Sequence, residues 1–291
     1  MSKTPSICIV IPYFGQWPFW VNFFLESCRY NPTVNWLIYT DCGMLNQCPP
    51  NVEIKSISYS DYCKHVSNKL GINFSPLNPY KLCDIRPTYG LIHENDLINY
   101  DFWGFGDIDL IYGNIRNFLT NERLTHKDVF SNHSTRTSGH LCLIRNLPDL
   151  KIAFRKMPHW QQKFTTQQHL AIDEKDFSKL FLRHKNSPQI IQAIAKMFDP
   201  WLKRAEYMEA YSTPNARIAW IDGSYHFPKK WSWQNGTLTN DINGNLQFMY
   251  FHFYGWKKQW PQQEKIIFPP RPLQSFAITA SGFDEFKSIV L

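Results

Sequence analysis

Two aspartates separated by a single residue, Asp107 and Asp109, are the side chains of this sequence best suited to bind a metal. Residues two apart on a strand point to the same side, and at a strand end both carboxylates can turn toward one ion. Hard oxygen donors suit Mg²⁺ or Mn²⁺, which can in turn bridge to a nucleotide diphosphate. Charges flanked by Phe105, Ile108 and Leu110 are costly unless they are solvated or neutralised. The pattern therefore favours a metal site over a solvated loop.

A second candidate ligand, His252, lies near the end of an expected strand over residues 246–253 and precedes Gly255 and Lys258. Neutral imidazole can complete the coordination of Mn²⁺. The glycine would allow a close approach of the backbone, and the lysine could neutralise a phosphate oxygen. The alternative is a purely structural role for His252, because a lone histidine in an aromatic strand is commonly a hydrogen-bonded core residue.

The N-terminal third predicts the scaffold that would position such a site. Apolar, β-branched runs at 7–11 and 36–40 predict strands, and residues 18–30 between them predict a helix. This is a strand–helix–strand start, and ligands of such sheets bind beyond the carboxyl ends of the strands. The residues expected there are Pro12, Tyr13, Phe14 and Asp41. No GxGxxG or GxxxxGK[ST] motif occurs, so a dinucleotide fold or a P-loop is disfavoured.

The rest of the chain continues the α/β pattern and turns to β-structure from about residue 217. A further strand is expected at about 52–57, and an aromatic strand runs into Asp107. Other expected strands are 129–131 and 141–144, and other expected helices are 114–119, 149–157 and 167–182. No linker or repeat is visible, so we expect a single domain over residues 1–291.

Composition limits the classes of protein. The chain has 291 residues, 43% hydrophobic, 16% aromatic and a formal net charge of +7, which excludes a disordered or collagen-like protein. Seven cysteines without a CxxC pair predict neither a zinc site nor a disulfide framework, and favour buried thiols in a reducing compartment. We expect no membrane span and no signal peptide, hence a cytoplasmic protein. The many rings suggest some aromatic side chains at a binding surface.

Taken together, the aromatic-flanked DxD and the His252, Gly255, Lys258 and Trp260 tail resemble the metal-binding motifs of GT-A glycosyltransferases. The resemblance is strongest to the retaining family that includes glycogenin and bacterial lipopolysaccharide galactosyltransferases, where the tail commonly reads HxxGxxKPW; Gln259 replaces the proline here. Residues 81–90 and 102–109 are similar to a group of bacterial polysaccharide-biosynthesis proteins of the same superfamily. The implied fold is a Rossmann-like, mixed and mainly parallel sheet flanked by helices, with a β-rich C-terminal part.

The resemblance also implies roles for single residues. Asp107, Asp109 and His252 would hold Mn²⁺ or Mg²⁺, and Gly255 and Lys258 would meet the diphosphate. Residues 1–145 would bind the nucleotide-sugar and 146–291 the acceptor. The residues that would contact the nucleotide or the donor sugar are Pro12, Tyr13, Phe14, Asp41, Lys81, Asp84, Arg86, Gly139 and His140. Lys81, Asp84 and Arg86 could equally form a salt-bridged turn before Pro87.

Asp173 and Glu174, expected at a helix start, are the candidate catalytic carboxylates; a solvated helix cap is the alternative. An inverting enzyme needs such a base, whereas a retaining enzyme can pass the acceptor proton to the departing phosphate. The resemblance of the tail at residues 252–260 to retaining enzymes favours retention. Trp220, Asp222, Trp231 and Trp233 could form a sugar-stacking platform or pack in the core.

The predicted function is metal-dependent transfer of a hexose, with galactose favoured, from a UDP-sugar to a saccharide acceptor in bacterial surface polysaccharide synthesis. Nucleotidyl or phosphoryl transfer, and non-enzymatic binding of polysaccharide or RNA, remain alternatives. We expect no nucleic-acid partner. A lipid-linked acceptor would explain the basic and aromatic residues at 201–204 and 229–231 through peripheral contact with the inner face of the cytoplasmic membrane.

Overall fold

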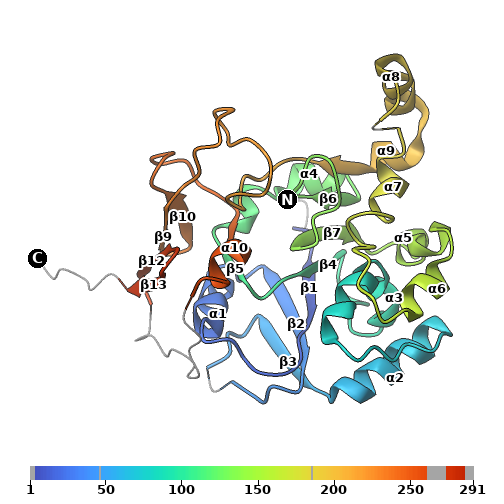
Figure 1. Cartoon of the computed structure of the whole chain (residues 1–291), viewed down its shortest axis with the longest axis horizontal. Coiled ribbons are helices and arrows are strands. Elements are labelled where there is room, and N and C mark those ends of the chain that lie inside the picture. Colours follow the sequence, from blue (N-terminus) through green and yellow to red (C-terminus); the bar gives the residue numbers. More distant parts are fainter. Residues whose placement is uncertain (1–3, 46, 185, 261–272, 286–291) are drawn as a thin grey trace, which may run out of the picture.

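The computed structural model describes residues 4–45, 47–184, 186–260 and 273–285. A seven-stranded sheet in the order β3-β2-β1-β4-β7-β6-β8 forms its centre (Figure 1). Four of its neighbouring pairs are parallel, while β7 runs antiparallel to both β4 and β6. The expected mixed, mainly parallel α/β sheet is therefore confirmed. Its strands are β1 (Ile7–Pro12), β2 (Val34–Thr40), β3 (Val52–Ser56), β4 (Phe102–Gly106), β6 (Val129–Ser131), β7 (Leu141–Arg145) and β8 (Ala205–Tyr207).

The central strands are buried on both faces, as their unbroken apolar sequences predict. In β1, Cys8 and Val10 join one hydrophobic cluster, whereas Ile7, Ile9 and Ile11 join another on the opposite face. This alternation follows from the period of two along a strand. Helix α1 (Val21–Arg29) packs in the second cluster, and α2 (Tyr59–Leu70) packs in the first. The carboxyl ends of β1 and β4 are left open for a site.

Most helices beyond α2 are short. The further helical segments are η1 (Pro79–Thr88), α3 (Tyr89–Ile92), η2 (Ile115–Asn117), α4 (Asn121–His126), α5 (Pro148–Lys151), η3 (Ala153–Lys156), α6 (Trp160–Thr165), α7 (Ser178–Phe181), α8 (Gln189–Phe198) and α9 (Pro200–Arg204). None of the helices in the described part of the chain combines the length and the apolar character that a membrane span requires.

The helix expected over residues 167–182 is wrong for most of that range, since only α7 forms there. Ala171 has a φ of 54°, a left-handed conformation that a right-handed helix cannot pass through. The buried Asp84 carboxylate accepts the backbone N–H groups of Leu170 and Ile172 at 2.9 and 3.0 Å. Tertiary contacts thus replace the helical hydrogen bonds, and Asp173 and Glu174 lie in a turn instead of at a helix start.

The C-terminal part is rich in β-structure, as expected. A four-stranded sheet has the order β10-β9-β12-β13, and a two-stranded ribbon pairs β11 with β5. These strands are β5 (Leu110–Tyr112), β9 (Lys230–Gln234), β10 (Thr237–Asn240), β11 (Tyr250–His252), β12 (Ser275–Thr279) and β13 (Gly282–Glu285). The strand expected at 246–253 is shorter because Phe248 bonds to Leu238 before β11 begins. Short helix α10 (Tyr254–Lys257) follows β11.

All seven cysteines are free thiols. Cys8, Cys28, Cys63 and Cys142 are buried, and Cys42, Cys48 and Cys83 are half-buried. No disulfide framework joins the described elements, in agreement with the odd number and spacing of the cysteines.

Candidate active site

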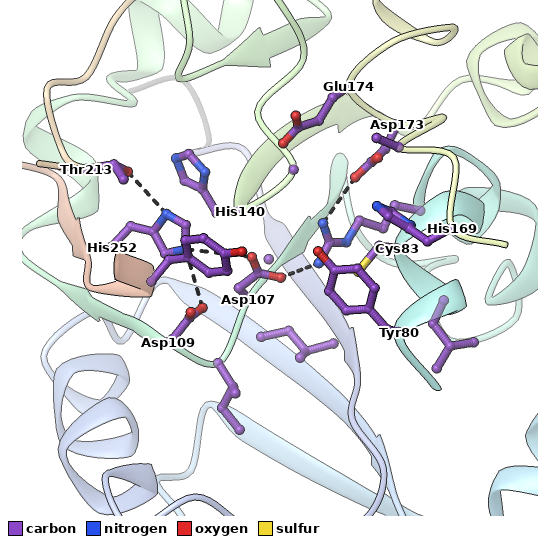
Figure 2. Close-up of a pocket in the computed structure, with 18 of the residues that line it drawn as sticks. Tyr80, Cys83, Asp107, Asp109, His140, His169, Asp173, Glu174, Thr213 and His252 are labelled. Atoms are coloured by element: carbon purple, nitrogen blue, oxygen red, sulfur yellow. Dashed lines mark hydrogen bonds and ion pairs between the residues drawn. The ribbon is translucent and has the colours of Figure 1, made fainter. Parts of the chain in front are cut away.

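A cavity of about 790 Å³ opens beyond the carboxyl ends of β1 and β4. Pro12, the last residue of β1, lines it with Tyr13 and Phe14, and Asp107 and Asp109 line it in the turn that follows β4. Figure 2 shows His252 and Thr213 on one side, Asp173 and His169 on the other, and Asp107 between them. The cavity thus lies where a parallel sheet is expected to bind ligands.

Asp107, Asp109 and His252 converge although 143 positions separate Asp109 from the histidine. The ribbon causes this, because β11 pairs antiparallel with β5 and sets His252 opposite Leu110. His252 Nε2 lies 3.5 Å from Asp109 Oδ1 and 4.0 Å from Asp107 Oδ2. One ligand atom from each residue lies within 4.8 Å of the others.

The chemistry of this group fits a divalent cation. His252 Nε2 is buried without a hydrogen bond, while Nδ1 lies 3.1 Å from the Thr213 hydroxyl oxygen. A partner on Nδ1 is the usual way to orient a histidine whose other nitrogen binds a metal. Two carboxylates and one imidazole match the donor preferences of Mn²⁺, and of Mg²⁺ with water ligands. Within the described residues this is the only such group of three or more acidic, histidine or cysteine side chains.

Two basic side chains neutralise the carboxylates. Lys257 Nζ lies 2.6 Å from Asp109 Oδ2, and the Arg86 guanidinium pairs with Asp107. Burial raises the pKa of Asp109, but His252 and Lys257 outweigh this effect and hold the pKa well below its ordinary value. Burial raises the pKa of Asp107, assisted by the Asp109 charge and opposed by Arg86. The cost of burying the two carboxylates is thus offset by cationic side chains, a role that a divalent cation would also fill.

Arg86 connects the aspartates to the other wall of the cavity. Its second terminal nitrogen lies 3.1 Å from Asp173 Oδ2, and burial raises the pKa of Asp173 to about 6 against the lowering effect of Arg86. Glu174 lies beside Asp173 and pairs with Arg136 at 3.3 Å. A side chain on Gly139 would fall within 3.1 Å of Arg86, Asp173 and Glu174. The glycine is thus needed for these groups to meet.

His140 forms the floor of the cavity beside His252 and Asp107. Its ring stacks on His252 with centroids 4.3 Å apart, and its carbonyl accepts the Asp107 N–H at 3.1 Å. Burial lowers the pKa of His140 well below its ordinary value, so the ring is neutral at physiological pH. His140 therefore fixes the loop at Asp107 and leaves the net charge of the site unchanged.

Four of the residues chosen from the sequence lie outside the cavity lining. Asp41 accepts the Gly15 N–H at 2.8 Å and fixes the loop after β1. Lys81 and Asp84 form a buried ion pair of 2.8 Å that holds the segments around Lys163 and Leu170. Lys258 donates to the Tyr254 hydroxyl instead. Of the two alternatives for residues 81–86, Lys81 and Asp84 thus form the salt-bridged turn, whereas Arg86 lines the cavity. Gly255 also lines the cavity.

Several cavity residues had no clear signal in the sequence. Lys257 adjoins Lys258, and only the short helix α10 decides which of them points at Asp109. Arg136, Thr213 and His169 come from loops without a motif. His169 Nδ1 lies 3.1 Å from the buried Asp84 carboxylate, which orients its ring. The sugar-stacking platform is not formed by Trp220, Trp231 and Trp233, which are at most 2% exposed and pack in the third hydrophobic cluster.

The chain has remote likenesses to solved glycosyltransferase structures. An active-site mutant of LgtC has a TM-score of 0.37 at 8% identity over 58% of this chain and 71% of its own. The galactosyltransferase LgtC in complex with donor and acceptor sugar analogs has a TM-score of 0.33 at 10% identity, covering 70% and 88%. Apo mouse xyloside xylosyltransferase 1 has a TM-score of 0.34 at 8% identity, covering 72% and 87%.

No curated protein sequence matches the chain. One family model, described as "Family of unknown function (DUF6625)", matches residues 9–287 and so spans the central sheet, both walls of the cavity and the C-terminal strands. The chain belongs to this family.

Proposed function

We propose that this protein transfers a hexose, with galactose favoured, from a UDP-sugar to a saccharide acceptor, and that Mn²⁺ or Mg²⁺ is required. One observation carries the proposal: Asp107, Asp109 and His252 meet on the wall of a cavity of about 790 Å³. That volume lies within the roughly 300–1,000 Å³ typical of small-molecule sites. Residues 1–145 would bind the donor, and 146–291 would supply the acceptor side and the metal-binding histidine.

The residues divide the work as follows. Asp107, Asp109 and His252 would hold the cation, which offsets the charge that develops on the diphosphate as the sugar–phosphate bond breaks. Lys257 and Arg86 flank the same carboxylates, and both can turn toward phosphate oxygens once a cation takes over the neutralisation. Tyr13 and Phe14, after β1, offer rings for the uracil. Lys257 thereby replaces Lys258 as our candidate for the diphosphate contact.

Asp173 and Glu174 lie across the cavity from the metal ligands and would contact hydroxyl groups of the donor or acceptor sugar. Each is held by an arginine, Arg86 and Arg136 respectively, which restricts its freedom to act as a proton acceptor. We therefore propose retention of configuration at the anomeric carbon, in line with the tail at residues 252–260. The anomeric proton coupling in the NMR spectrum of the product distinguishes retention from inversion.

The place of the reaction is part of the proposal. A bacterial surface polysaccharide would be assembled at the inner face of the cytoplasmic membrane, and a lipid-linked acceptor would bring the protein there. Nucleotidyl or phosphoryl transfer commonly uses a second metal with further carboxylates. The described residues offer a single group of three ligands, which favours one cation and glycosyl transfer.

The test is a thermal shift assay with UDP, GDP and CMP, each with and without Mn²⁺. We expect one nucleoside diphosphate to raise the unfolding temperature strongly in the presence of Mn²⁺, and Asp109→Asn to lose that rise because a metal ligand becomes neutral. Asp61→Asn, on the exposed surface of α2, is the matched control and should behave like wild type.

Each alternative has its own outcome. Nucleic-acid binding that is indifferent to Mn²⁺ would favour the binding protein, and a preference for nucleoside triphosphates with pyrophosphate release would favour nucleotidyl transfer. Equal stabilisation of wild type and Asp109→Asn by UDP and Mn²⁺ would refute the metal site. Hydrolysis of UDP-galactose to UDP and galactose, slow and Mn²⁺-dependent, is the expected activity without an acceptor.

A further inference from the structure

Helix α8 exposes an unusual amount of apolar surface. Figure 1 shows it at the extremity of the molecule, beyond α7 and α9 and away from the sheet. Five large apolar side chains of this ten-residue helix lie 45–75% exposed: Ile190, Ile191, Ile194, Met197 and Phe198. Such a concentration on one short element is uncommon on a protein that is surrounded by water alone.

These side chains form one stripe instead of being scattered. At 100° per residue, positions 190, 191, 194, 197 and 198 fall within an arc of about 120°, the width of an ordinary core-facing stripe. Gln189 and Gln192 occupy the opposite side, and Ala195, 7% exposed, is the residue that packs inward. The helix thus turns its core-type face outward, while a small residue suffices to attach it.

Positive charge accompanies the apolar stripe. Between residues 183 and 204 the sequence has five Lys or Arg residues and one acid, Asp199. Two of these cations are already paired, Arg183 with Asp199 and Arg204 with Asp128 and Asp149, so the others and the neighbouring η3 supply the available charge. Helix α9 lies against α8, and Lys203 on α9 is exposed. Lys156 Nζ lies 4.0 Å from the centre of the Trp201 ring, which ties the exposed Arg155 and Lys156 of η3 to the same end of the molecule. Apolar and cationic groups are therefore presented together.

We propose that α8 lies in the surface of an anionic membrane, with its apolar stripe among the acyl chains and the exposed Arg155, Lys156 and Lys203 at the lipid phosphates. A strongly amphipathic helix with flanking cations is the usual form of an interfacial helix. Each Lys or Arg near an anionic surface adds attraction that salt screens. The proposal concerns a surface remote from the cavity and does not depend on the reaction catalysed there.

A second copy of the chain fits the stripe less well. A stable dimer buries about 800 Å² on each partner, whereas a helix of ten residues is only about 15 Å long. An isologous contact would also bring two identical basic regions together, which costs electrostatic energy. A lipid surface has neither problem, because it is continuous and negatively charged.

The test is flotation of the full chain with vesicles of phosphatidylcholine alone and with vesicles that also contain phosphatidylglycerol. We expect binding only to the anionic vesicles, and weaker binding at high salt. Ile194→Glu should lower the partition coefficient about tenfold or more, since one apolar side chain no longer leaves water. Gln189→Glu adds the same charge on the opposite side of α8 and should stay within about twofold of wild type.

Folding and self-association are controlled separately. Glutamate is a good helix former, so Ile194→Glu should keep the circular dichroism spectrum and melting temperature of wild type. Ile194→Leu should keep full vesicle binding. No flotation of wild type with anionic vesicles at low salt would overturn the proposal. So would equal binding by Ile194→Glu and Gln189→Glu, or a wild-type dimer in solution that Ile194→Glu dissociates.

Discussion

At the scale of single residues, the proposed binding of a diphosphate depends on the charge balance around Asp109. Lys257 contacts this carboxylate, whereas its neighbour Lys258 turns to Tyr254. We expect Lys257→Ala to weaken UDP binding in the presence of Mn²⁺ by about tenfold, the value of one charge-assisted contact. Lys258→Ala is the matched control and should change the dissociation constant less than about threefold. Isothermal titration of UDP into the Mn²⁺-loaded variants measures both, and the reverse ranking would contradict the assignment.

The raised pKa of Asp173 predicts how the free energy of unfolding depends on pH. Its pKa is raised from 3.8 to about 6, so between about pH 4 and 6 the folded protein holds a proton that the unfolded chain has lost. The free energy of unfolding must therefore fall as pH rises through this range. Asp173→Asn should remove that slope, which urea unfolding at several pH values would reveal.

The exposed Asp222 serves as the control for Asp173, because its contribution to the free energy of unfolding changes with pH in the opposite direction. The Ser224 backbone N–H lowers the pKa of Asp222, so the small stability that it contributes is lost as pH falls. A pH dependence in Asp173→Asn identical to that of wild type would show that Asp173 does not bind the proton.

At the scale of elements, the pairing of β5 with β11 is what brings the histidine to the aspartates. Gly113 ends this ribbon, and a Cβ there would lie 2.3 Å from the Phe248 carbonyl oxygen. We expect Gly113→Ala to lower the free energy of unfolding by about 1–3 kcal/mol through overpacking. It should also weaken Mn²⁺ binding, because β11 and His252 must shift.

Gly255→Ala is the control for this element. An added Cβ there meets no atom within 4 Å, so its unfolding midpoint should stay close to that of wild type. Chemical denaturation gives the stability, and the Mn²⁺-dependent thermal shift with UDP reports on the site. A Gly113→Ala variant with normal stability and a normal shift would show that the ribbon tolerates displacement.

At the scale of the whole molecule, the aromatic content is explained mainly by packing. Of the eleven tryptophans, seven are buried and four are half-buried. Trp231 stacks on Phe251, one residue before His252, with ring centroids 4.5 Å apart. The aromatic cluster thus supports β11 and His252 from behind, and a stripe of exposed apolar side chains lies on α8 instead.

The sequence by itself determined the start of the sheet and singled out Asp107, Asp109 and His252, the three side chains that meet in the cavity. Buried strands such as 7–11 are recognisable because burial on both faces leaves an unbroken apolar run, and paired carboxylates among apolar residues have few other uses. Local sequence patterns wrongly predicted a helix over residues 167–182. There the carboxylate of Asp84, more than 80 positions away, accepts backbone N–H groups that a helix would have bonded internally.

Only the tertiary structure decided which basic groups reach the site. Arg86 bridges Asp107 and Asp173, and Lys257 faces Asp109 where Lys258 does not. Nothing in the spacing of these residues encodes such contacts, because their geometry depends on how separate loops and one short helix pack together. The outward direction of the α8 stripe has the same origin, since a helical pattern shows that one face is apolar but not what that face meets.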